Sequence, residues 1–321
     1  MSVVARFTAM RQQPWWPWLK RGLGFAFLAV VVFLLVRYAR GVNWPEVKRS
    51  LLELPRSVLM PAFVMAGVAH LVYSLLDLVG RHYTGHSLSP FKVMQVSLVS
   101  YAFNLNLGSI VGGIGFRYRL YTRLGLRPGE ITRIVTLSMI TNWLGYILLA
   151  GAVFTFAPLE LPPNWKLDSG GLRVLGAILL AAIAAYLCFT AWTRTRTYVV
   201  RGHEIVIPTF RVALVQLAIS CTHWLAMAAI PWLLLQGEIN YSTALSVLLI
   251  AAIAGVITHV PAGLGVVEAV FIALLSHRVP EHQLLGALLA YRALFYILPL
   301  LGGGLLYLAT ELQARKTAPA A

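Results

Sequence analysis

Long apolar segments separated by short polar ones follow one another along the whole chain. Most of them approach the roughly 20 residues that an α-helix needs to cross the hydrocarbon core of a bilayer. The pattern therefore predicts an all-α polytopic membrane protein, with residues 1–321 forming a single membrane domain. The apolar segments cover approximately residues 22–39, 57–79, 93–116, 131–157, 172–193, 211–235, 243–276 and 284–310.

Two of these segments are interrupted by residues that break helices. Residues 93–116 contain several asparagines and glycines, and residues 243–276 contain Pro261-Ala262-Gly263-Leu264-Gly265 in a stretch long enough for two half-crossings. A helix can break at membrane depth only where protein or a water-filled cavity satisfies the freed backbone groups. We therefore predict six full transmembrane helices plus two re-entrant helical hairpins, one in each interrupted segment.

The distribution of basic residues determines how these segments are threaded, because basic loops prefer the cytoplasm. If each hairpin returns to the side from which it starts, the inner side holds 17 Lys and Arg residues, including those of a basic loop at 194–211, and the outer side holds 8. Threading 93–116 as a full span would expel the arginines from Arg117 to Arg133. We therefore expect both termini in the cytoplasm and an uncleaved first helix at 22–39.

Composition narrows the classes of function. The chain has 321 residues, of which 59% are hydrophobic and 12% charged, and its formal net charge is +15. Because the basic residues lie in short gaps between apolar segments, the expected partners are anionic phospholipids and not nucleic acid. The basic residues on the predicted outer side fit an amphipathic segment from Trp44 to Leu54 on the membrane interface. No HExxH, phosphate-loop or nucleophile-elbow motif is present, so we predict no metal, cofactor or catalytic residue.

A weak internal repeat relates the two interrupted regions. A shift of 150 residues places Gly113-Ile114-Gly115 on Gly263-Leu264-Gly265. Identity elsewhere is low, which leaves coincidence as the alternative. If the repeat is real, its halves are residues 93–157 and 243–310. An odd number of spans between them makes them inverted, which is a recurrent transporter architecture.

Ionisable side chains within apolar segments are a strong local sign of function, since an Asp, Lys or Arg costs at least about 2.5 kcal/mol at the bilayer centre. Asp77 either lines a polar cavity or forms a structural pair with Arg81 at a helix end. Glu268 follows the break in the second hairpin and Arg292 lies in the middle of the last helix, so an ion pair between them would let both be buried. His259, just before the break, is a further candidate.

Glycines and arginines are combined at the end of the first hairpin. Gly113 and Gly115 would leave backbone N–H groups accessible at the start of a helix, where an anion binds favourably. Arg117 and Arg119 could donate paired hydrogen bonds to the oxygens of a lipid phosphate. The alternative is a positive-inside signal alone, and it explains the later arginines better.

Polar residues on other segments point to the same interior. Asn104 in the first hairpin and Asn142 in the fourth segment are candidates for contacts with a lipid headgroup. The alternative for each polar residue taken singly is a hydrogen bond between helices. The two polar faces comprise Ser138, Thr141, Asn142 and Gly145 in the fourth segment, and Gln216, Ser220 and His223 in the sixth.

Four motifs taken together are similar to a known family. They are Asn104-Leu-Asn-Leu-Gly-Ser109, Gly112-Gly-Ile-Gly-Phe-Arg-Tyr-Arg-Leu-Tyr-Thr-Arg-Leu-Gly125, Thr141-Asn-Trp-Leu-Gly-Tyr146 and Pro261-Ala-Gly-Leu-Gly-Val-Val-Glu268. This combination, which covers most of the chain, resembles the transmembrane region of lysylphosphatidylglycerol synthases, above all the proteobacterial inner-membrane branch without the synthase part. Ala262 departs from the family's Pro-Gly-Gly-x-Gly-x-x-Glu pattern, whereas Glu268 keeps its acidic position.

The resemblance implies a flippase-like fold that moves aminoacylated or other anionic phospholipids between the leaflets of a bacterial inner membrane. Because the chain ends at Ala321 without an aminoacyl-transfer domain, we expect no lysyl transfer. Two alternatives stay open. One is a membrane-embedded enzyme acting on lipid headgroups, with Asp77, His259 and Glu268 as acid or base candidates. The other is a scaffold for a lipid-synthesising enzyme partner, and the oligomeric state is open in each case.

Overall fold

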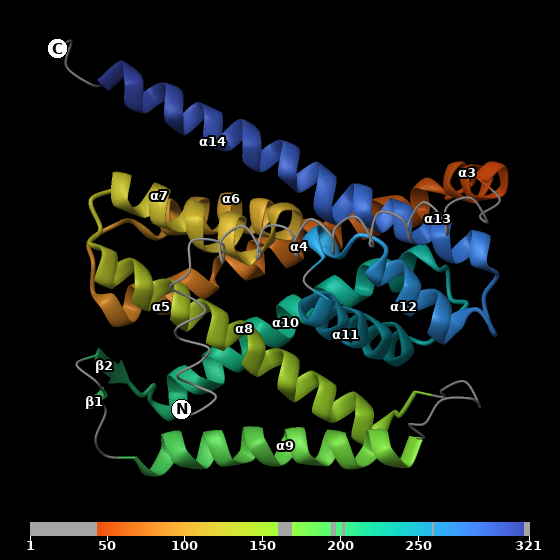
Figure 1. Ribbon diagram of the computed structural model, residues 1–321, viewed down its shortest axis with the longest axis horizontal. Coiled ribbons are helices and arrows are strands. Elements are labelled where there is room, and N and C mark those ends of the chain that lie inside the picture. Colours follow the sequence, from red (N-terminus) through yellow and green to blue (C-terminus); the bar gives the residue numbers. More distant parts are fainter. Residues whose placement is uncertain (1–43, 160–168, 194–196, 201–202, 259, 318–321) are drawn as a thin grey trace, which may run out of the picture. The chain divides into compact units, whose positions relative to one another are not determined.

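The computed structural model describes residues 44–159, 169–193, 197–200, 203–258 and 260–317 of the chain. Figure 1 shows the order of the elements. The described residues from Glu46 onward belong to one compact unit. The predicted helix at 22–39 and the candidate residue His259 lie outside the described residues.

The described elements are almost all helical, which confirms the all-α prediction. The helices are α3 (Trp44–Leu52), α4 (Arg56–Ser74), α5 (Leu76–Thr84), α6 (Pro90–Gly108), η1 (Ser109–Gly115), α7 (Phe116–Arg123), α8 (Pro128–Phe156), α9 (Ser169–Trp192), α10 (Phe210–Leu234), α11 (Tyr241–Thr258), η2 (Pro261–Gly263), α12 (Val266–Leu275), α13 (Glu281–Arg292), η3 (Ala293–Ile297) and α14 (Leu298–Thr317). Two short strands, β1 (Thr197–Val200) and β2 (His203–Val206), form an antiparallel hairpin within the predicted basic loop.

Seven helical stretches in the described part of the chain are long and apolar enough to cross a membrane. They fall in the predicted apolar segments, and their bounds are Arg56–Thr84, Pro90–Arg123, Pro128–Phe156, Ser169–Trp192, Phe210–Leu234, Tyr241–Thr258 and Glu281–Thr310. The division of these stretches into full spans and re-entrant hairpins stays a prediction, as does the side on which each loop lies.

The chain reverses direction at Gly108, whose φ of 82° separates α6 from the π-helical segment η1. η1 and α7 then return along α6 and pack against it. A side chain at Gly112 would collide with the backbone of Phe103 on α6, and the rings of Phe103 and Phe116 stack with centroids 4.0 Å apart. The first interrupted segment is therefore a helical hairpin. It extends over residues 90–123, beyond the predicted 93–116, and its turn at Gly108 lies after the middle of the segment.

α11 and α12 form the second hairpin and pack against each other. The break between them contains η2, where Ala262 has a φ of 58° and Gly263 a φ of 55°, and Gly265 follows with a φ of 76°. Residues with a side chain rarely adopt these left-handed conformations, which accounts for the glycines at this turn. The predicted break at residues 261–265 is confirmed.

Local signals in the sequence start the helices around the first hairpin. Ser89 caps α6 by accepting the N–H of Lys92, and Pro90 stands in the first turn, where its missing N–H costs nothing. The Glu130 carboxylate accepts the N–H of Arg127 at the start of α8. These caps end the loops on either side of the hairpin. α5, α6, α7 and α8 come together at this end and contact one another.

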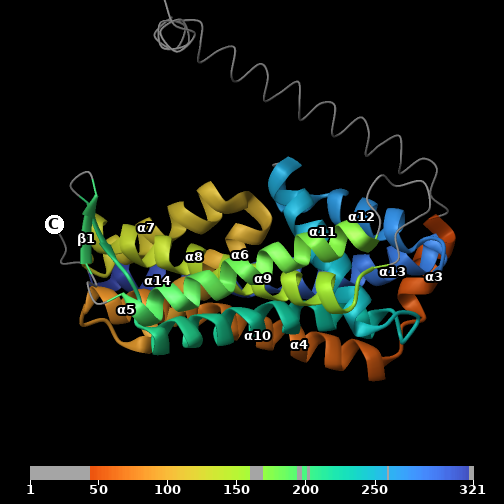
Figure 2. The ribbon, with the colours of Figure 1, turned by 90° about the horizontal axis from the view of Figure 1, so that it is seen from below.

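α10 packs against α4, α8, α11 and α13. α9 lies on the outside of α8 and α10 (Figures 1 and 2), and it exposes large apolar side chains on its outer face. They are Val174, Leu175, Ile178, Phe189 and Trp192. An apolar surface of this kind is unfavourable in water and suits contact with lipid.

Candidate functional site

The two hairpins, hairpin 1 (residues 90–123) and hairpin 2 (residues 241–275), meet at their tips. α6, the first arm of hairpin 1, packs against η2 at the turn of hairpin 2. Near the end of α6, the Asn106 side-chain amide donates to the Ala102 carbonyl at 2.9 Å and to the Tyr296 carbonyl at 3.1 Å. Tyr296 lies in η3, the π-helical segment that interrupts the last long helix directly after Arg292. Three interrupted helices therefore come together at this junction.

Arg292 and Glu268 form an ion pair at the junction, the arrangement that the sequence left open as a way to bury both charges. The guanidinium donates to both carboxylate oxygens, with 2.8 Å from Nη2 to Oε2. It also donates to the main-chain carbonyls of Ala262 at 3.1 Å and Gly263 at 2.9 Å, so one arginine holds the turn of hairpin 2 as well as its second arm. The two side chains keep 11% and 13% of their surface exposed, and the Tyr296 ring lies 5.3 Å from the guanidinium carbon.

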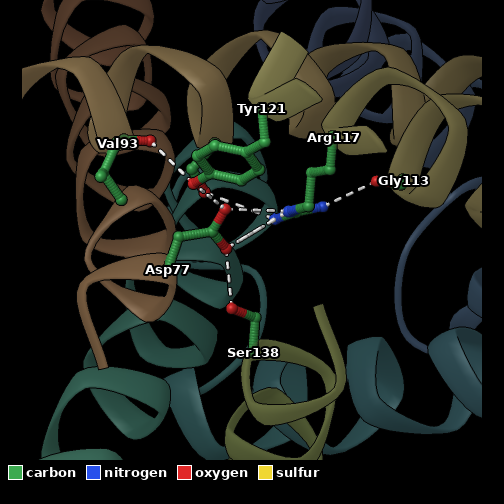
Figure 3. Close-up of polar contacts among 7 residues, drawn as sticks. Asp77, Val93, Gly113, Arg117, Tyr121 and Ser138 are labelled. Atoms are coloured by element: carbon green, nitrogen blue, oxygen red, sulfur yellow. Dashed lines mark hydrogen bonds and ion pairs between the residues drawn. The ribbon is translucent and has the colours of Figure 1, made fainter. Parts of the chain in front are cut away.

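A second buried ion pair connects hairpin 1 to the helices around it (Figure 3). Arg117 donates from Nε to Asp77 Oδ2 at 3.0 Å and from Nη2 to Oδ1 at 3.1 Å. The hydroxyls of Tyr121 and Ser138 donate to the same carboxylate at 2.9 and 2.7 Å. Arg117 is also bonded to its own hairpin, through the Gly113 carbonyl at 3.1 Å. The network therefore joins α5, α7, η1 and α8.

This geometry contradicts the predicted phosphate contact of Arg117. Its side chain is only 4% exposed, that of Asp77 is fully buried, and the guanidinium donates to protein acceptors through all three of its nitrogens. The alternative prediction of a pair between Asp77 and Arg81 is also wrong, because Arg81 donates to the Leu88 carbonyl at 2.7 Å. Asp77 and Arg81 have the helical spacing of four residues, but Asp77 pairs with Arg117 because hairpin 1 brings Arg117 within hydrogen-bond distance.

The prediction for the glycines of hairpin 1 was wrong in its physical reason. Gly113 and Gly115 do not begin a helix, since η1 continues into α7 through Gly115 with helical angles. Their N–H groups are thus not at a helix start. Gly112 and Gly113 are buried against α6, where a Cβ at Gly113 would lie 2.8 Å from the Asn104 side-chain oxygen. These glycines allow two helices to approach closely, and Asn104 packs over one of them.

Arg119, the other predicted phosphate ligand, has a different environment. It is exposed, and its guanidinium carbon lies 5.6 Å from the centre of the Tyr307 ring on α14. A contact between Arg119 and a lipid phosphate stays a prediction.

The polar faces of α8 and α10 contact each other across the helix interface. Gln216 donates to Thr141 at 2.8 Å, and Ser220 donates to the main-chain carbonyl of Asn142 at 2.8 Å. The alternative of hydrogen bonds between helices is therefore the correct explanation for these residues. The side-chain oxygen of Asn142 is buried and has no hydrogen-bond partner among the described residues, so its predicted headgroup contact stays a prediction.

An aromatic cluster that the sequence analysis did not predict fills the space between α4, α6 and α10. The rings of Tyr73 and Tyr101 stack with centroids 3.5 Å apart, and the Tyr101 hydroxyl lies 3.2 Å from His223 Nε2. His223 Nδ1 donates to the Ala69 carbonyl at 3.0 Å. The Tyr73 ring also lies 5.8 Å from the guanidinium carbon of Arg117. Of the residues in this cluster, the sequence analysis had named only His223, on the polar face of the sixth segment.

Comparison with known proteins assigns the chain to a family. The family model described as the lysylphosphatidylglycerol synthase TM region matches residues 22–303. The chain belongs to this family. The lysylphosphatidylglycerol synthase TM region is a membrane region, in agreement with the seven apolar helices of the described residues, so the chain is a polytopic membrane protein.

Relatives within this family differ in length. The inner membrane protein YbhN of Escherichia coli (strain K12) is 48% identical over 307 residues, which make up 95% of this chain and 96% of that protein. The uncharacterized protein slr0712 of Synechocystis is 30% identical over 80% of this chain and 81% of its own length. A phosphatidylglycerol lysyltransferase of Staphylococcus haemolyticus is 24% identical over 86% of this chain, but the match covers only 32% of that enzyme.

Proposed function

We propose that this chain moves phospholipids with an anionic phosphate between the two leaflets of the bacterial inner membrane. The family relationship supports the substrate class, since one relative is named an inner membrane protein and others are named phosphatidylglycerol lysyltransferases. The observation that carries the proposal is the partly exposed pair of Arg292 and Glu268 at the junction of the hairpin tips. Charged groups inside a membrane protein are expensive and commonly mark a substrate pathway.

The chemistry of Arg292 suits exchange of one anion for another. A guanidinium donates paired hydrogen bonds to a phosphate as readily as to a carboxylate. A lipid phosphate that reached Arg292 would replace Glu268 and weaken the attachment of the second arm of hairpin 2. The carbonyl contacts of Ala262 and Gly263 would keep the turn oriented during this exchange. Transport then proceeds as hairpin 2 changes its position and opens the pathway to the other leaflet.

Asp77 and Arg117 have a supporting role in this proposal. Their network ties hairpin 1 to α5 and α8, so hairpin 1 remains fixed while hairpin 2 moves. This assignment replaces the earlier prediction that Arg117 receives the phosphate. Arg119 remains a candidate for the first contact with a headgroup, because it is exposed at the end of hairpin 1.

The alternative of a headgroup enzyme receives less support from the geometry. A general acid or base needs a free position within hydrogen-bond reach of the substrate. Asp77 is fully buried and accepts hydrogen bonds from Arg117, Tyr121 and Ser138. We therefore propose that the chain is not an enzyme. A scaffold without transport activity would tolerate substitution of the interior charges, which the transport experiment also tests.

The experiment follows labelled phosphatidylglycerol in liposomes that contain the purified protein. A fluorescent headgroup in the outer leaflet is bleached by an impermeant reductant, and the protected fraction is measured over time. Arg292→Ala should reduce the transport rate at least about tenfold, since hydrogen bonds to a charged group contribute roughly 1.5–3 kcal/mol each. Arg211→Ala is the matched control, because Arg211 is exposed at the start of α10 and lies outside the junction.

Two results would contradict the proposal. If wild-type liposomes moved the label no faster than protein-free liposomes, the transport function would be wrong. If Arg292→Ala and Arg211→Ala transported equally well, transport would not depend on the junction. Mass spectrometry that found a chemically changed lipid would favour the enzyme.

A further inference from the structure

The last long helix is interrupted directly after Arg292 by the π-helical segment η3. Pro299 accounts for this interruption, because it has no N–H to donate to the preceding turn and its ring clashes with the carbonyl four residues earlier. The Leu298 N–H bonds to the Ala293 carbonyl, five residues back. A helix with such an interruption can bend, so contacts from neighbouring helices determine its angle at this point.

The two sides of η3 have different neighbours. α13, which ends with Arg292, packs against α10 and against α12, the second arm of hairpin 2. α14 packs against α6 of hairpin 1, so closely that a Cβ at Gly303 would lie 3.0 Å from the Ala102 Cβ. A change in the relative position of the two hairpins would therefore bend the last helix at η3. Single-turn π-helical segments of this kind are frequent at functional sites.

Asn106 on α6 connects hairpin 1 to η3 through its side chain. Its Nδ2 carries two hydrogens, and it donates to the Ala102 carbonyl within α6 at 2.9 Å and to the Tyr296 carbonyl in η3 at 3.1 Å. The bond within α6 restricts the orientation of the amide and so directs its second N–H toward η3. The Tyr296 ring in turn lies 5.3 Å from the guanidinium carbon of Arg292. One residue of η3 therefore contacts both the amide of hairpin 1 and the charge at the junction.

We propose that Asn106 is a positioning residue for Arg292. By holding the Tyr296 carbonyl, the amide fixes η3 and keeps the guanidinium within reach of Glu268 and the turn of hairpin 2. Without this donor the helix is free to bend before Pro299, and Arg292 loses its fixed position although its own acceptors are unaltered. The effect on transport rests on the proposed function, whereas the position of Arg292 can be measured independently of it.

The test compares Asn106→Leu, which keeps the approximate size of the side chain but removes its donors, with Gln95→Leu. Gln95 is the matched control, because it lies on the same helix about three turns before Asn106 and outside the junction. Protein labelled with ¹⁵N at its arginines is reconstituted in lipid bilayers. The Nε signals of Arg292 and Arg117 are assigned by their loss in Arg292→Lys and Arg117→Lys. Asn106→Leu should shift the Arg292 signal and not the Arg117 signal, and Gln95→Leu should shift neither.

Transport rates separate positioning from a general loss of structure. Asn106→Leu alone should slow the transport of labelled phosphatidylglycerol about fivefold, the factor given by one hydrogen bond of about 1 kcal/mol. In the Arg292→Ala background it should cause no further loss, because the guanidinium that it positions is gone. An equal loss in both backgrounds would show a structural role alone and would overturn the proposal. An Arg292 signal that Asn106→Leu leaves unchanged would also overturn it.

Pro299→Ala tests the same segment without changing Asn106. The new N–H can complete the helical hydrogen bonds, so this variant should be more stable than wild type and should nevertheless shift the Arg292 signal. A signal at the wild-type position would contradict the role of η3 in placing Arg292. If wild-type liposomes showed no transport, the proposed function would be wrong, and the NMR signals would still decide whether Asn106 positions Arg292.

Discussion

The two ion pairs of this chain contain the same chemical groups and differ in their surroundings. Arg117 and Asp77 are enclosed, and two hydroxyls from separate helices complete the carboxylate. Arg292 and Glu268 remain partly exposed, and the arginine holds the main-chain carbonyls of a turn with left-handed residues. The enclosed pair is suited to a permanent joint between helices, and the exposed pair to a joint that another anion can open.

The two hairpins share one contact that involves positions matched by the predicted internal repeat. In both hairpins an arginine donates to the carbonyl of a glycine, Gly113 in the first and Gly263 in the second. These two glycines coincide under the shift of 150 residues that defines the predicted repeat. The arginines themselves do not coincide, because Arg117 belongs to its hairpin and Arg292 to the helix that follows. In each hairpin a glycine carbonyl therefore accepts a hydrogen bond from an arginine. In the first the arginine belongs to the hairpin itself, and in the second it belongs to the following helix.

The largest expected effect is on stability. Asp77→Ala leaves the buried Arg117 without a counter-charge, and removal of one partner from a buried pair costs roughly 3–5 kcal/mol. Glu268→Ala should cost clearly less, since its partner Arg292 is partly exposed and also donates to the carbonyls of Ala262 and Gly263. Equilibrium unfolding in mixed detergent micelles measures both values. Equal losses for the two variants would remove the distinction between an enclosed joint and an open one.

A smaller effect is expected from the hydroxyl that completes the Asp77 carboxylate. Tyr121→Phe removes a donor 2.9 Å from Asp77 and should lower the free energy of unfolding by roughly 1.5–3 kcal/mol, the range for a hydrogen bond to a charged group. Tyr118→Phe is a matched control on the same helix, because its hydroxyl contacts the uncharged, exposed Thr132. If both variants lost the same stability, the charge of Asp77 would not strengthen the hydrogen bond of Tyr121.

Sequence reasoning predicted the hairpins and singled out Glu268 and Arg292 because their signals are local. Pro261 and the glycines after it break α11 at the turn itself, and Glu268 and Arg292 stand alone as charges in apolar helices. It did not predict the partner of Asp77, because 40 residues and a reversal of the chain separate it from Arg117. Arg81, four residues after Asp77, was the stronger signal in the sequence, although its side chain donates to the Leu88 carbonyl.

The same limit explains why the glycines of hairpin 1 were misread. A run such as Gly112 to Gly115 has one sequence but two physical uses: it can expose N–H groups to a ligand or allow a neighbouring helix to approach. Only the position of Phe103 and Asn104 on the facing arm decides between these uses. In hairpin 2 the glycines have positive φ angles, so the backbone itself requires them and the sequence reading was correct.

The smallest expected effect compares one glycine from each hairpin. Gly112→Ala must displace the backbone of Phe103, and overpacking of this kind costs typically about 1–3 kcal/mol. Gly263→Ala meets only the Val267 side chain at 3.6 Å, so its cost is the left-handed backbone alone, roughly 1 kcal/mol. Unfolding measurements should show the larger loss for Gly112→Ala.

The two variants should also differ in how they affect transport, and this difference bears on which hairpin moves. Strain at Gly263 acts on the turn that Arg292 holds, so Gly263→Ala should change the transport rate more than its small stability loss implies. Gly112→Ala should leave the rate of the folded fraction nearly unchanged, because hairpin 1 is the fixed partner in the proposed mechanism. The reverse result, with transport sensitive to Gly112 and indifferent to Gly263, would make hairpin 1 the moving element and would reverse the roles of the two ion pairs.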